Sequence, residues 1–511
     1  DVYKRQEQGN DVYENQELPI AASDVDCILL THAHIDHSGL IPLMYVNGFR
    51  GQVYSTSATA QLCEIMLRDS AHIQMFEAEW RNRKAARSGG KLKEFVPLYD
   101  MDAAVNVCKQ FVGCEYDRVY DIAEGIKIRF TDVGHLLGSA SIEVWATEKT
   151  ENGDVTEKIV FSGDIGNINK PIIKDPKHVR DADYIVMEST YGNRSHGGTP
   201  NYVEDLTDIF KRTFERGGNV VIPSFAVGRT QELLYIIRKI KEDNLVGRDF
   251  DVYMDSPLAI EATNIFIKNV ESCFDDEAVE LVRKGINPLS FPGLKYATTG
   301  DESKQINFDP NPKVIISSSG MCEAGRIRHH LKHNLWRPEC TIVFVGYQAV
   351  GTTGRIIVDG AEEIKLFGEP IQIKAEIVQL KGSSGHADKD GLLCWINAFD
   401  TKPKKVFVVH GEDSVCDEFT ECLKEEYGYD AMAPYTGGSY DLIADRVISE
   451  GVKERKTRRT TSTQRGKTVF DRLVAAGKRL MTVITHNEGG TNKDLAKFTD
   501  QINALCDKWD R

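Results

Sequence analysis

The chain has 511 residues, of which 41% are hydrophobic, and a formal net charge of −14. This length predicts two or three domains, and the negative charge argues against a general polyanion binder, so nucleic acid would need a local basic or metal-lined cleft. No apolar run approaches the length of a membrane-spanning helix, and the 11 scattered cysteines, without a Cys-x-x-Cys pair, are typical of free thiols in a reducing cytoplasm.

Two patterns of predicted elements divide most of the chain. Up to about residue 193, short apolar runs indicate buried or half-buried strands at residues 25–30, 126–130, 142–145, 159–161 and 184–187. From about residue 201, predicted strands alternate with helices, as at residues 219–222 and 230–241. This alternation predicts parallel β-α-β units and a separate α/β domain. Short strands return after about residue 381, notably at residues 405–409.

The last part of the chain has a different composition. Residues 453–467 are rich in Lys, Arg and Thr, which predicts a flexible linker. Residues 492–509 then have apolar side chains at helical spacing, at Leu495, Phe498 and Ile502. This helix packs either on the body of the protein or on a partner, and a homodimer through it is one open alternative.

The most informative motif is Thr-His-Ala-His-Ile-Asp-His-Ser at residues 31–38, directly after an apolar run. Its side chains His32, His34, Asp36 and His37 are of the types that bind zinc and related divalent ions. A structural zinc site usually includes cysteine, and this motif has none. Four ligands this close cannot all serve one ion comfortably. A strand that turns into a helix would direct two of them at one metal and two at another. A chance His-rich turn is improbable.

Three further candidate ligands follow predicted strands. His135, Asp164 and His410 each come after an apolar run and have glycine within two residues, which allows the backbone to turn tightly. Each one alone is more often a hydrogen-bonded core residue. Together with the motif they supply five histidines and two aspartates, a set that suits two metals with a bridging carboxylate.

The chain resembles the metallo-β-lactamase fold and, within it, the β-CASP branch of RNA-processing nucleases, over roughly residues 10–445. Besides residues 31–38, the resemblance rests on Met-Glu-Ser-Thr-Tyr-Gly at 187–192, Pro-Ser-Phe-Ala-Val-Gly-Arg-Thr-Gln-Glu at 223–232, Ser-Ser-Gly-Met at 318–321, Gly-Tyr-Gln at 346–348 and Ser-Gly-His-Ala-Asp at 384–388. It implies an α/β protein, a metallo-β-lactamase αββα sandwich with an inserted α/β β-CASP domain.

The resemblance implies that seven residues hold two Zn²⁺ ions per chain. These are His32, His34 and His135 for one zinc, Asp36, His37 and His410 for the other, and Asp164 as the bridge between them. Asp36 also belongs to the implied catalytic set. In such a centre, two ions hold a hydroxide between them and stabilise the attacking and leaving oxygens of a phosphodiester.

Glu188, His386 and His410 match three additional motifs of the branch. A histidine at the third position goes with members that act on RNA, so His410 favours RNA as substrate. We expect the RNA partner to be single-stranded. His386 is the candidate acid for the leaving oxygen, and Glu188 would orient it and raise its pKa. The alternative is that Glu188 and His386 form a structural ion pair between two domains.

Substrate binding would come from other groups. Ser383, Ser384 and the amides around Gly385 could donate hydrogen bonds to a phosphate. Arg229, at the start of a predicted helix, could reach a phosphate together with the helix N-terminus, or be an ordinary surface arginine. Tyr347 could stack on a base or simply pack.

A second group of histidines, His329, His330 and His333, has helical spacing in the predicted α/β domain. The resemblance implies no metal there. We interpret these histidines as the polar face of a helix.

Four segments are expected from the resemblance. Residues 1–193 form the first part of the metallo-β-lactamase domain, 194–382 the β-CASP domain, 383–446 the second part of the first domain, and 447–511 a linker and C-terminal helical tail. Family members have several strands before the metal motif, including an Asp-Cys-Gly-type turn. Because that segment is absent before His32, we expect an N-terminally truncated fragment.

The leading interpretation is a cytoplasmic two-zinc ribonuclease, acting as an endonuclease, a 5′-exonuclease or both, with its active site between the two domains. A small-molecule hydrolase of the wider superfamily would share residues 31–38 but lack the insert, Glu188 and His386. A catalytically inactive scaffold of an RNA-processing complex would have lost metal ligands, and none is lost here.

Overall fold

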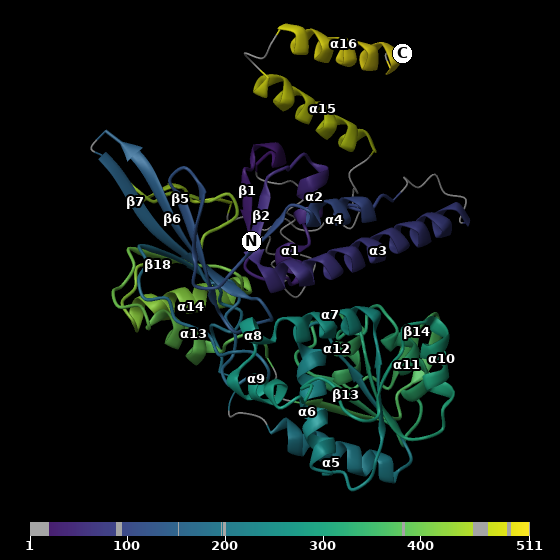
Figure 1. The fold of residues 1–511 in the computed structure, drawn as a ribbon. Helices are drawn as coiled ribbons and strands as arrows, with labels where there is room; N and C mark the ends of the chain where they lie inside the picture. Colours follow the sequence, from purple (N-terminus) through teal and green to yellow (C-terminus); the bar gives the residue numbers. More distant parts are fainter. Residues whose placement is uncertain are drawn as a thin grey trace.

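The computed structural model describes residues 20–87, 95–151, 153–195, 197, 201–380, 384–452, 469–487 and 492–509. Within them, two large sheets with their helices form two bodies (Figure 1). The predicted linker at residues 453–467 and the predicted phosphate contact Ser383 lie outside the described residues.

The first body contains a seven-stranded sheet in the order β18-β17-β8-β7-β6-β5-β4. Its strands are β4 (Val119–Ala123), β5 (Ile126–Asp132), β6 (Ala140–Thr150), β7 (Gly153–Phe161), β8 (Tyr184–Met187), β17 (Lys405–Val408) and β18 (Ala431–Met432). Strands β4 to β7 pair antiparallel, whereas β7, β8, β17 and β18 pair parallel. Because β17 lies beside β8, the chain leaves this sheet after β8 and returns to it much later.

A smaller parallel sheet packs on the seven-stranded one. It consists of β1 (Cys27–Leu29), β2 (Gln52–Thr56) and β3 (Phe111–Cys114). Cys114 and Leu29 from this sheet pack with Ile128, Phe130 and Ile142 of the larger sheet. This contact makes a two-sheet sandwich.

Helices cover both outer faces of the sandwich. The short 3₁₀ turn Ala22–Asp24 and the helices α1 (Ile35–Ser38), α2 (Ile41–Val46), α3 (Ser57–Arg87) and α4 (Met101–Cys108) accompany the small sheet. On the opposite face, α13 (Lys389–Ile396) and α14 (Asp413–Glu425) bury Trp395 and Phe419 against Val160 and Ile185 of the large sheet. The layers therefore follow the predicted αββα order.

The second body has a six-stranded, entirely parallel sheet in the order β11-β10-β12-β9-β13-β16. Its strands are β9 (Val220–Pro223), β10 (Asp251–Asp255), β11 (Leu294–Tyr296), β12 (Lys313–Ser317), β13 (Thr341–Val345) and β16 (Glu376–Leu380). Strands β9 and β12 are buried throughout, as expected when both faces of a parallel sheet are covered.

Helices on both faces explain this burial. They are α5 (Tyr202–Glu215), α6 (Arg229–Glu242), α7 (Pro257–Lys268), α8 (Val270–Cys273), α9 (Asp276–Arg283), α10 (Gly300–Phe308), α11 (Ile327–Asn334) and α12 (Thr353–Val358). Val220 and Ile222 of β9 pack with α5 to α7, whereas Val221 packs with α10 to α12. The predicted parallel β-α-β units are confirmed.

The two bodies share one apolar contact. Helix α3 of the first lies along α7 of the second, and Leu62 and Phe266 belong to one continuous core cluster (Figure 1). This packing of α3 against α7 fixes one body against the other. The loop that follows β7 then reaches the first turn of α6, where Lys170 Nζ lies 3.2 Å from Glu232 Oε1.

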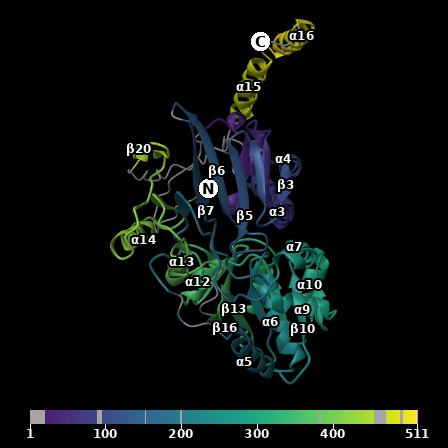
Figure 2. The same cartoon turned by 60° about the vertical axis from the view of Figure 1, so that its left-hand side comes forward.

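The remaining elements lie outside the two main sheets. Two hairpins are β14 (Glu363–Leu366) with β15 (Glu369–Gln372), and β19 (Ser439–Asp441) with β20 (Arg446–Ser449). Helices α15 (Val469–His486) and α16 (Asn492–Trp509) stand away from both bodies (Figures 1 and 2). Among the described residues, no helix has the length and apolar content needed to cross a membrane.

Candidate metal centre and active site

The motif at residues 31–38 occupies the turn between a strand and a helix, as predicted. Strand β1 ends at Leu29, and α1 begins at Ile35 with His34 immediately before it. Asp36 and His37 lie in the first turn of α1. This change of direction sends His32 and His34 toward one side of the centre and Asp36 and His37 toward the other.

The first group of donor atoms contains three imidazoles and one carboxylate. His34 Nδ1 lies 3.1 Å from His32 Nε2 and 3.1 Å from His135 Nε2. Asp164 Oδ2 lies 3.3 Å from His32 Nε2 and 3.5 Å from His135 Nε2. These four side chains have donor atoms close enough to share one metal ion.

The second group lies on the other side of Asp164. His37 Nε2 and His410 Nε2 are 3.1 Å apart, and Asp164 Oδ1 is 3.3 Å from His37 Nε2. Asp36 Oδ2 lies 3.7 Å from His410 Nε2 and 3.8 Å from His37 Nε2. Asp36 is exposed, so this side of the centre is the one open to solvent.

Asp164 therefore presents one oxygen to each group. Its side chain is buried, and Oδ1 has no hydrogen-bond partner of acceptable geometry among the described residues. A buried carboxylate oxygen without a hydrogen bond is costly, and a cation bound there removes that cost. The donor set fits divalent metal ions, and Asp164 lies between its two groups.

The electrostatics suit metal binding. Burial and the neighbouring His32 lower the pKa of His34 to about 3, so its ring is neutral and can offer a lone pair at neutral pH. Burial also lowers the pKa of His32 and of His135. For His37 and His410, burial opposes protonation, but the nearby Asp164 carboxylate raises the pKa of both.

Glu188 and His386 meet beside this centre. Glu188 directly follows β8 and is buried, and His386 Nδ1 lies 3.1 Å from its Oε2. The other ring nitrogen, His386 Nε2, lies 3.9 Å from Asp164 Oδ2. Burial disfavours the imidazolium, but Glu188 and Asp164 together raise the pKa of His386. Glu188 also accepts hydrogen bonds from the amides of Ile165 and Thr190, which fix its orientation.

The loops that carry these residues are tied to one another. Gly166 pairs with His386, and a Cβ on Gly166 would lie 1.9 Å from the carbonyl oxygen of Gly134, so only glycine permits this approach. His135 Nδ1 lies 3.1 Å from the carbonyl oxygen of Gly385, which orients the ring. In the same way Thr190 Oγ1 lies 3.1 Å from His410 Nδ1. Sequence analysis did not assign this role to Thr190, although its motif was noted.

The predicted substrate contacts occupy different environments. Ser384 Oγ accepts a hydrogen bond from the amide of His386, and the Gly385 carbonyl accepts one from Asn167. Arg229 is the first residue of α6, as predicted, and it is mostly buried 2.5 Å from Glu232. Tyr347 follows β13 and is 46% exposed. Their contact with RNA stays a prediction.

Phe225 is a residue that sequence analysis did not select. It follows β9, is 50% exposed, and lies against Gly320, which follows β12. Gln348 donates to the Gly320 carbonyl at 3.1 Å, so Phe225 and Tyr347 belong to one edge of the six-stranded sheet. The signal that the sequence offered for this residue was an aromatic side chain within the motif at residues 223–232.

The second group of histidines does not converge. His330 is buried, with its Nε2 2.6 Å from Asp255 Oδ2 and its Nδ1 3.0 Å from Asn307 Oδ1, whereas His329 stacks on Phe367. The interpretation of a polar helix face is therefore wrong for His330, because a buried aspartate and amide satisfy its ring. In the described part of the chain, the clusters of side chains that could hold a metal ion do not include these histidines.

Comparisons with known proteins identify the class. The Beta-Casp domain matches residues 230–357, and the Zn-dependent metallo-hydrolase RNA specificity domain matches residues 370–434. Ribonuclease TTHA0252 of Thermus thermophilus is 34% identical over 390 residues, which cover 76% of this chain and 82% of that protein. The RNase J-like protein of Methanocaldococcus jannaschii is 31% identical over 392 residues, 76% of this chain and 82% of its own length.

A third relative is longer than the region it shares with the chain. Transcription termination factor FttA of Methanosarcina mazei is 32% identical over 421 residues, 80% of this chain and 62% of the factor. The fold and the donor set define a metal-dependent hydrolase with an inserted α/β domain. The chain belongs to the β-CASP family of hydrolytic RNA nucleases with the metallo-β-lactamase fold.

Proposed function

We propose that the chain hydrolyses phosphodiester bonds of single-stranded RNA, using two Zn²⁺ ions. The observation that carries this proposal is Asp164, whose two oxygens face two separate histidine groups. His386 lies beside the same carboxylate and is held by a buried glutamate. The matched RNA specificity domain and the relative named a ribonuclease support RNA as the substrate.

Seven residues of the chain would hold the two ions. They are His32, His34 and His135 in one group, Asp36, His37 and His410 in the other, and Asp164 between them. Bound divalent ions supply Lewis-acid stabilisation of phosphate oxygens and lower the pKa of water toward neutrality. Because Asp36 is the exposed member, we propose that it lies on the side where substrate and water enter.

His386 is proposed as the acid for the leaving oxygen. Its Nδ1 is engaged by Glu188, so Nε2 is the atom left to carry a proton toward the centre. A raised pKa keeps that proton on the ring near neutral pH, where it can pass to the departing oxygen. Glu188 acts as a positioning residue, because its own oxygens are used by His386 and by two backbone amides.

The second domain is proposed to hold the RNA strand. The exposed rings of Phe225 and Tyr347 would stack on bases. Ser383, Ser384, Gly385 and Arg229 are the proposed phosphate contacts. We propose domain limits at residues 1–193, 194–382 and 383–446, with the linker and tail at 447–511. A small-molecule hydrolase has no need of the matched β-CASP domain.

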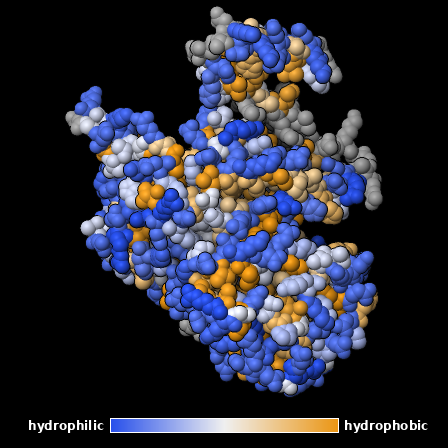
Figure 3. All heavy atoms as spheres, viewed as in Figure 1, coloured by the Kyte–Doolittle hydropathy of each residue, from blue (hydrophilic) through white to orange (hydrophobic). Residues whose placement is uncertain are grey.

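Two further parts of the proposal concern location and assembly. The 11 cysteines are free, which suits the reducing cytoplasm. Helices α15 and α16 expose the apolar side chains Leu473, Met481 and Trp509, and orange patches mark this region in Figure 3. A homodimer formed through these helices would cover them.

Cleavage of a 5′-labelled single-stranded RNA, with and without chelator, tests the proposed function. We expect cleavage that a chelator abolishes and Zn²⁺ restores, and atomic emission should find two zinc ions per chain. A ladder of products from one end means exonuclease action, and discrete internal products mean endonuclease action. Chelator-resistant cleavage, or none on any RNA tested, contradicts the proposal.

His386→Ala tests the proposed acid. Loss of general-acid catalysis should lower kcat by about 10²- to 10⁴-fold, while zinc content stays near two per chain. His333→Ala, which changes an exposed histidine of the second domain, is the matched control and should keep full activity. Loss of zinc from His386→Ala would instead make His386 a ligand.

A further inference from the structure

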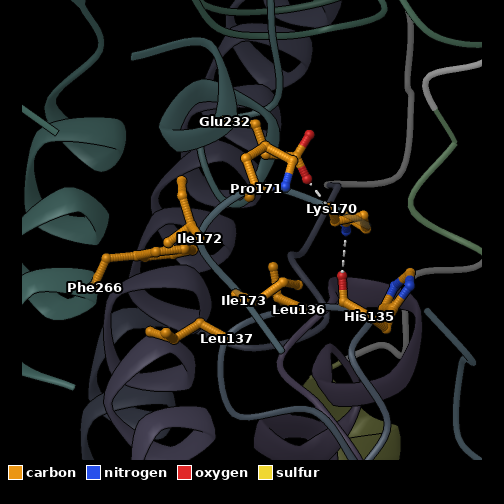
Figure 4. Close-up of a pocket in the computed structure, with 10 residues that line it drawn as sticks. His135, Leu136, Leu137, Lys170, Pro171, Ile172, Ile173, Glu232 and Phe266 are labelled. Atoms are coloured by element: carbon orange, nitrogen blue, oxygen red, sulfur yellow. Dashed lines mark hydrogen bonds and ion pairs between the residues drawn. The ribbon is translucent and has the colours of Figure 1, made fainter. Parts of the chain in front are cut away.

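Lys170 joins the two domains at the metal centre (Figure 4). It lies in the loop that follows β7 and carries Asp164. Its Nζ donates to the carbonyl oxygen of His135 at 2.9 Å and lies 3.2 Å from Glu232 Oε1 on α6 of the second domain. Glu232 in turn pairs with Arg229 at 2.5 Å. A cross-domain ion pair is thus bonded to the backbone of a proposed ligand.

The surroundings of this contact shield it from bulk solvent. The side chains of Lys170 and Glu232 are only 11% and 9% exposed. Beside them is a cavity of about 10 Å³, about the space of one water molecule, lined by apolar residues that include Leu136, Ile172 and Phe266. In Figure 4 dashed lines join the Lys170 ammonium to the Glu232 carboxylate on one side and to the His135 carbonyl on the other. Removing one partner of such a buried ion pair is costly, because the other charge is then left buried and unpaired.

The same ammonium adjoins the loop that carries His386. A Cβ built on Gly385 would lie 3.9 Å from Lys170 Nζ, and the Gly385 carbonyl lies 3.1 Å from His135 Nδ1. Three segments therefore meet around Lys170: the His135 loop, the Gly385 loop and the start of α6.

We infer that Lys170 is a positioning residue through which docking of the β-CASP domain sets the place of His135 in the metal centre. The inference rests on the proposed function. The backbone carbonyl of His135 is held by Lys170, and Lys170 is held in turn by Glu232 of the second domain, so seating of that domain fixes the position from which the imidazole reaches the donor set. Groups that orient a metal ligand in this way typically alter metal affinity by about 10- to 100-fold.

Lys170→Met removes the charge and keeps most of the side-chain volume. We expect Zn²⁺ affinity at the group that contains His135 to fall by about 10- to 100-fold, measured by competition with a chromophoric chelator on the metal-free full chain. Turnover should fall with it, while KM for RNA changes by less than about threefold. Glu232→Gln should weaken Zn²⁺ in the same direction, and the double variant should lose less than the product of the two single losses.

Lys174→Met is the matched control. Lys174, four residues further along the same loop, also crosses between domains, donating to the carbonyl of Ser272 at 2.9 Å, but it contacts none of the proposed ligands. It should keep the wild-type affinity for Zn²⁺. Equal losses in both lysine variants, or unchanged affinity in Lys170→Met, would overturn the inference. If Lys170→Met does not fold, Glu232→Gln against Lys174→Met decides the question.

The readout separates this inference from the proposed function. Zn²⁺ affinity is measured without any RNA. A wild-type chain that binds zinc but cleaves no RNA would therefore contradict the proposed activity and leave the test of Lys170 intact.

Discussion

The two domains each bury an aspartate against imidazole, and the surroundings of the two carboxylates differ. Asp255, at the end of β10, receives His330 Nε2 at 2.6 Å, Arg326 Nη1 at 2.7 Å and the Ser303 hydroxyl at 2.5 Å. Each of these neighbours can bring a proton to a carboxylate oxygen. This cluster is a complete hydrogen-bond network and needs no ion.

Asp164 has imidazoles around it but a different pattern of hydrogen bonding. Ring nitrogens face other ring nitrogens at 3.1 Å, as between His32 and His34 or His37 and His410, and Asp164 Oδ1 has no hydrogen bond of acceptable geometry among the described residues. In neutral rings, facing nitrogens cannot all donate. The comparison shows that converging lone pairs, rather than the number of histidines, separate a metal site from a structural network.

Asp164→Asn should produce the largest effect. Asparagine keeps the shape but removes the charge that both groups of ligands share. We expect RNA cleavage to fall by about 10³-fold or more, equivalent to about 4 kcal/mol, together with loss of bound zinc. Single-turnover cleavage and atomic emission measure the two effects. Retention of two zinc ions would mean that Asp164 is not the bridge.

Asp255→Asn should have the opposite profile. Removing the charge of this buried network leaves Arg326 without its carboxylate partner and weakens the hydrogen bond to His330, which costs about 3 kcal/mol of stability. Denaturant unfolding should show this loss, while zinc content stays as in the wild type. Zinc loss together with wild-type stability would contradict the structural role assigned to this cluster.

Asp132 shows what burial does to a carboxyl group without imidazole partners. Burial raises its pKa to about 7, despite a hydrogen bond from the amide of Gly134. Because the folded-state pKa lies above the unfolded value of 3.8, the folded chain holds the proton more tightly. Its stability should fall as pH rises from about 4 to 7, by at most about 1.4 kcal/mol per pH unit from this group.

Asp132→Asn should remove this dependence of the free energy of unfolding on pH. Denaturant unfolding at pH 5, 6, 7 and 8, in chelator, measures it. Asp255 provides the contrast: burial alone raises its pKa, but hydrogen bonds from His330, Ser303 and Arg326 outweigh burial and lower it. The stability that Asp255 contributes to the fold is therefore lost as pH falls below about 4. An unchanged slope in Asp132→Asn would show that its carboxyl titrates normally.

Five of the seven proposed ligands could be located from sequence because each follows the end of a strand. The other two, Asp36 and His37, lie in the first turn of α1 and were found through the dense motif at residues 31–38. That local signal survives in the structure, where β1, β7 and β17 all end at the donor set. In the second domain the buried strand β9 was predicted at residues 219–222, since both of its faces are apolar, whereas the partly exposed edge strands β11 and β16 were not predicted. The polar outer halves of β6 and β7 were missed, because residues 147–150 pair with residues 153–156 as a hairpin beyond the core.

Contacts between distant segments could not be predicted where no family motif links them. Nothing local indicates that Lys170 reaches Glu232 or that His330 is buried against Asp255, because these contacts depend on how the two sheets are placed. The αββα order and the inserted domain were predicted from the resemblance of motifs, and the structure shows how these layers and domains pack. The limits of the four segments stay predictions.

Phe225→Ala should have the smallest effect and tests what the second domain contributes. If that domain holds RNA while the first carries the chemistry, the variant should raise KM for single-stranded RNA and leave kcat within about threefold. Loss of one stacked base is worth about 1 to 3 kcal/mol, roughly a 5- to 150-fold rise. Tyr347→Ala should act in the same direction. Phe308→Ala removes an exposed ring on α10 of the same domain and should leave KM unchanged. A fall in kcat at unchanged KM would place Phe225 in the chemistry instead, and the division of labour between the two domains would then be wrong.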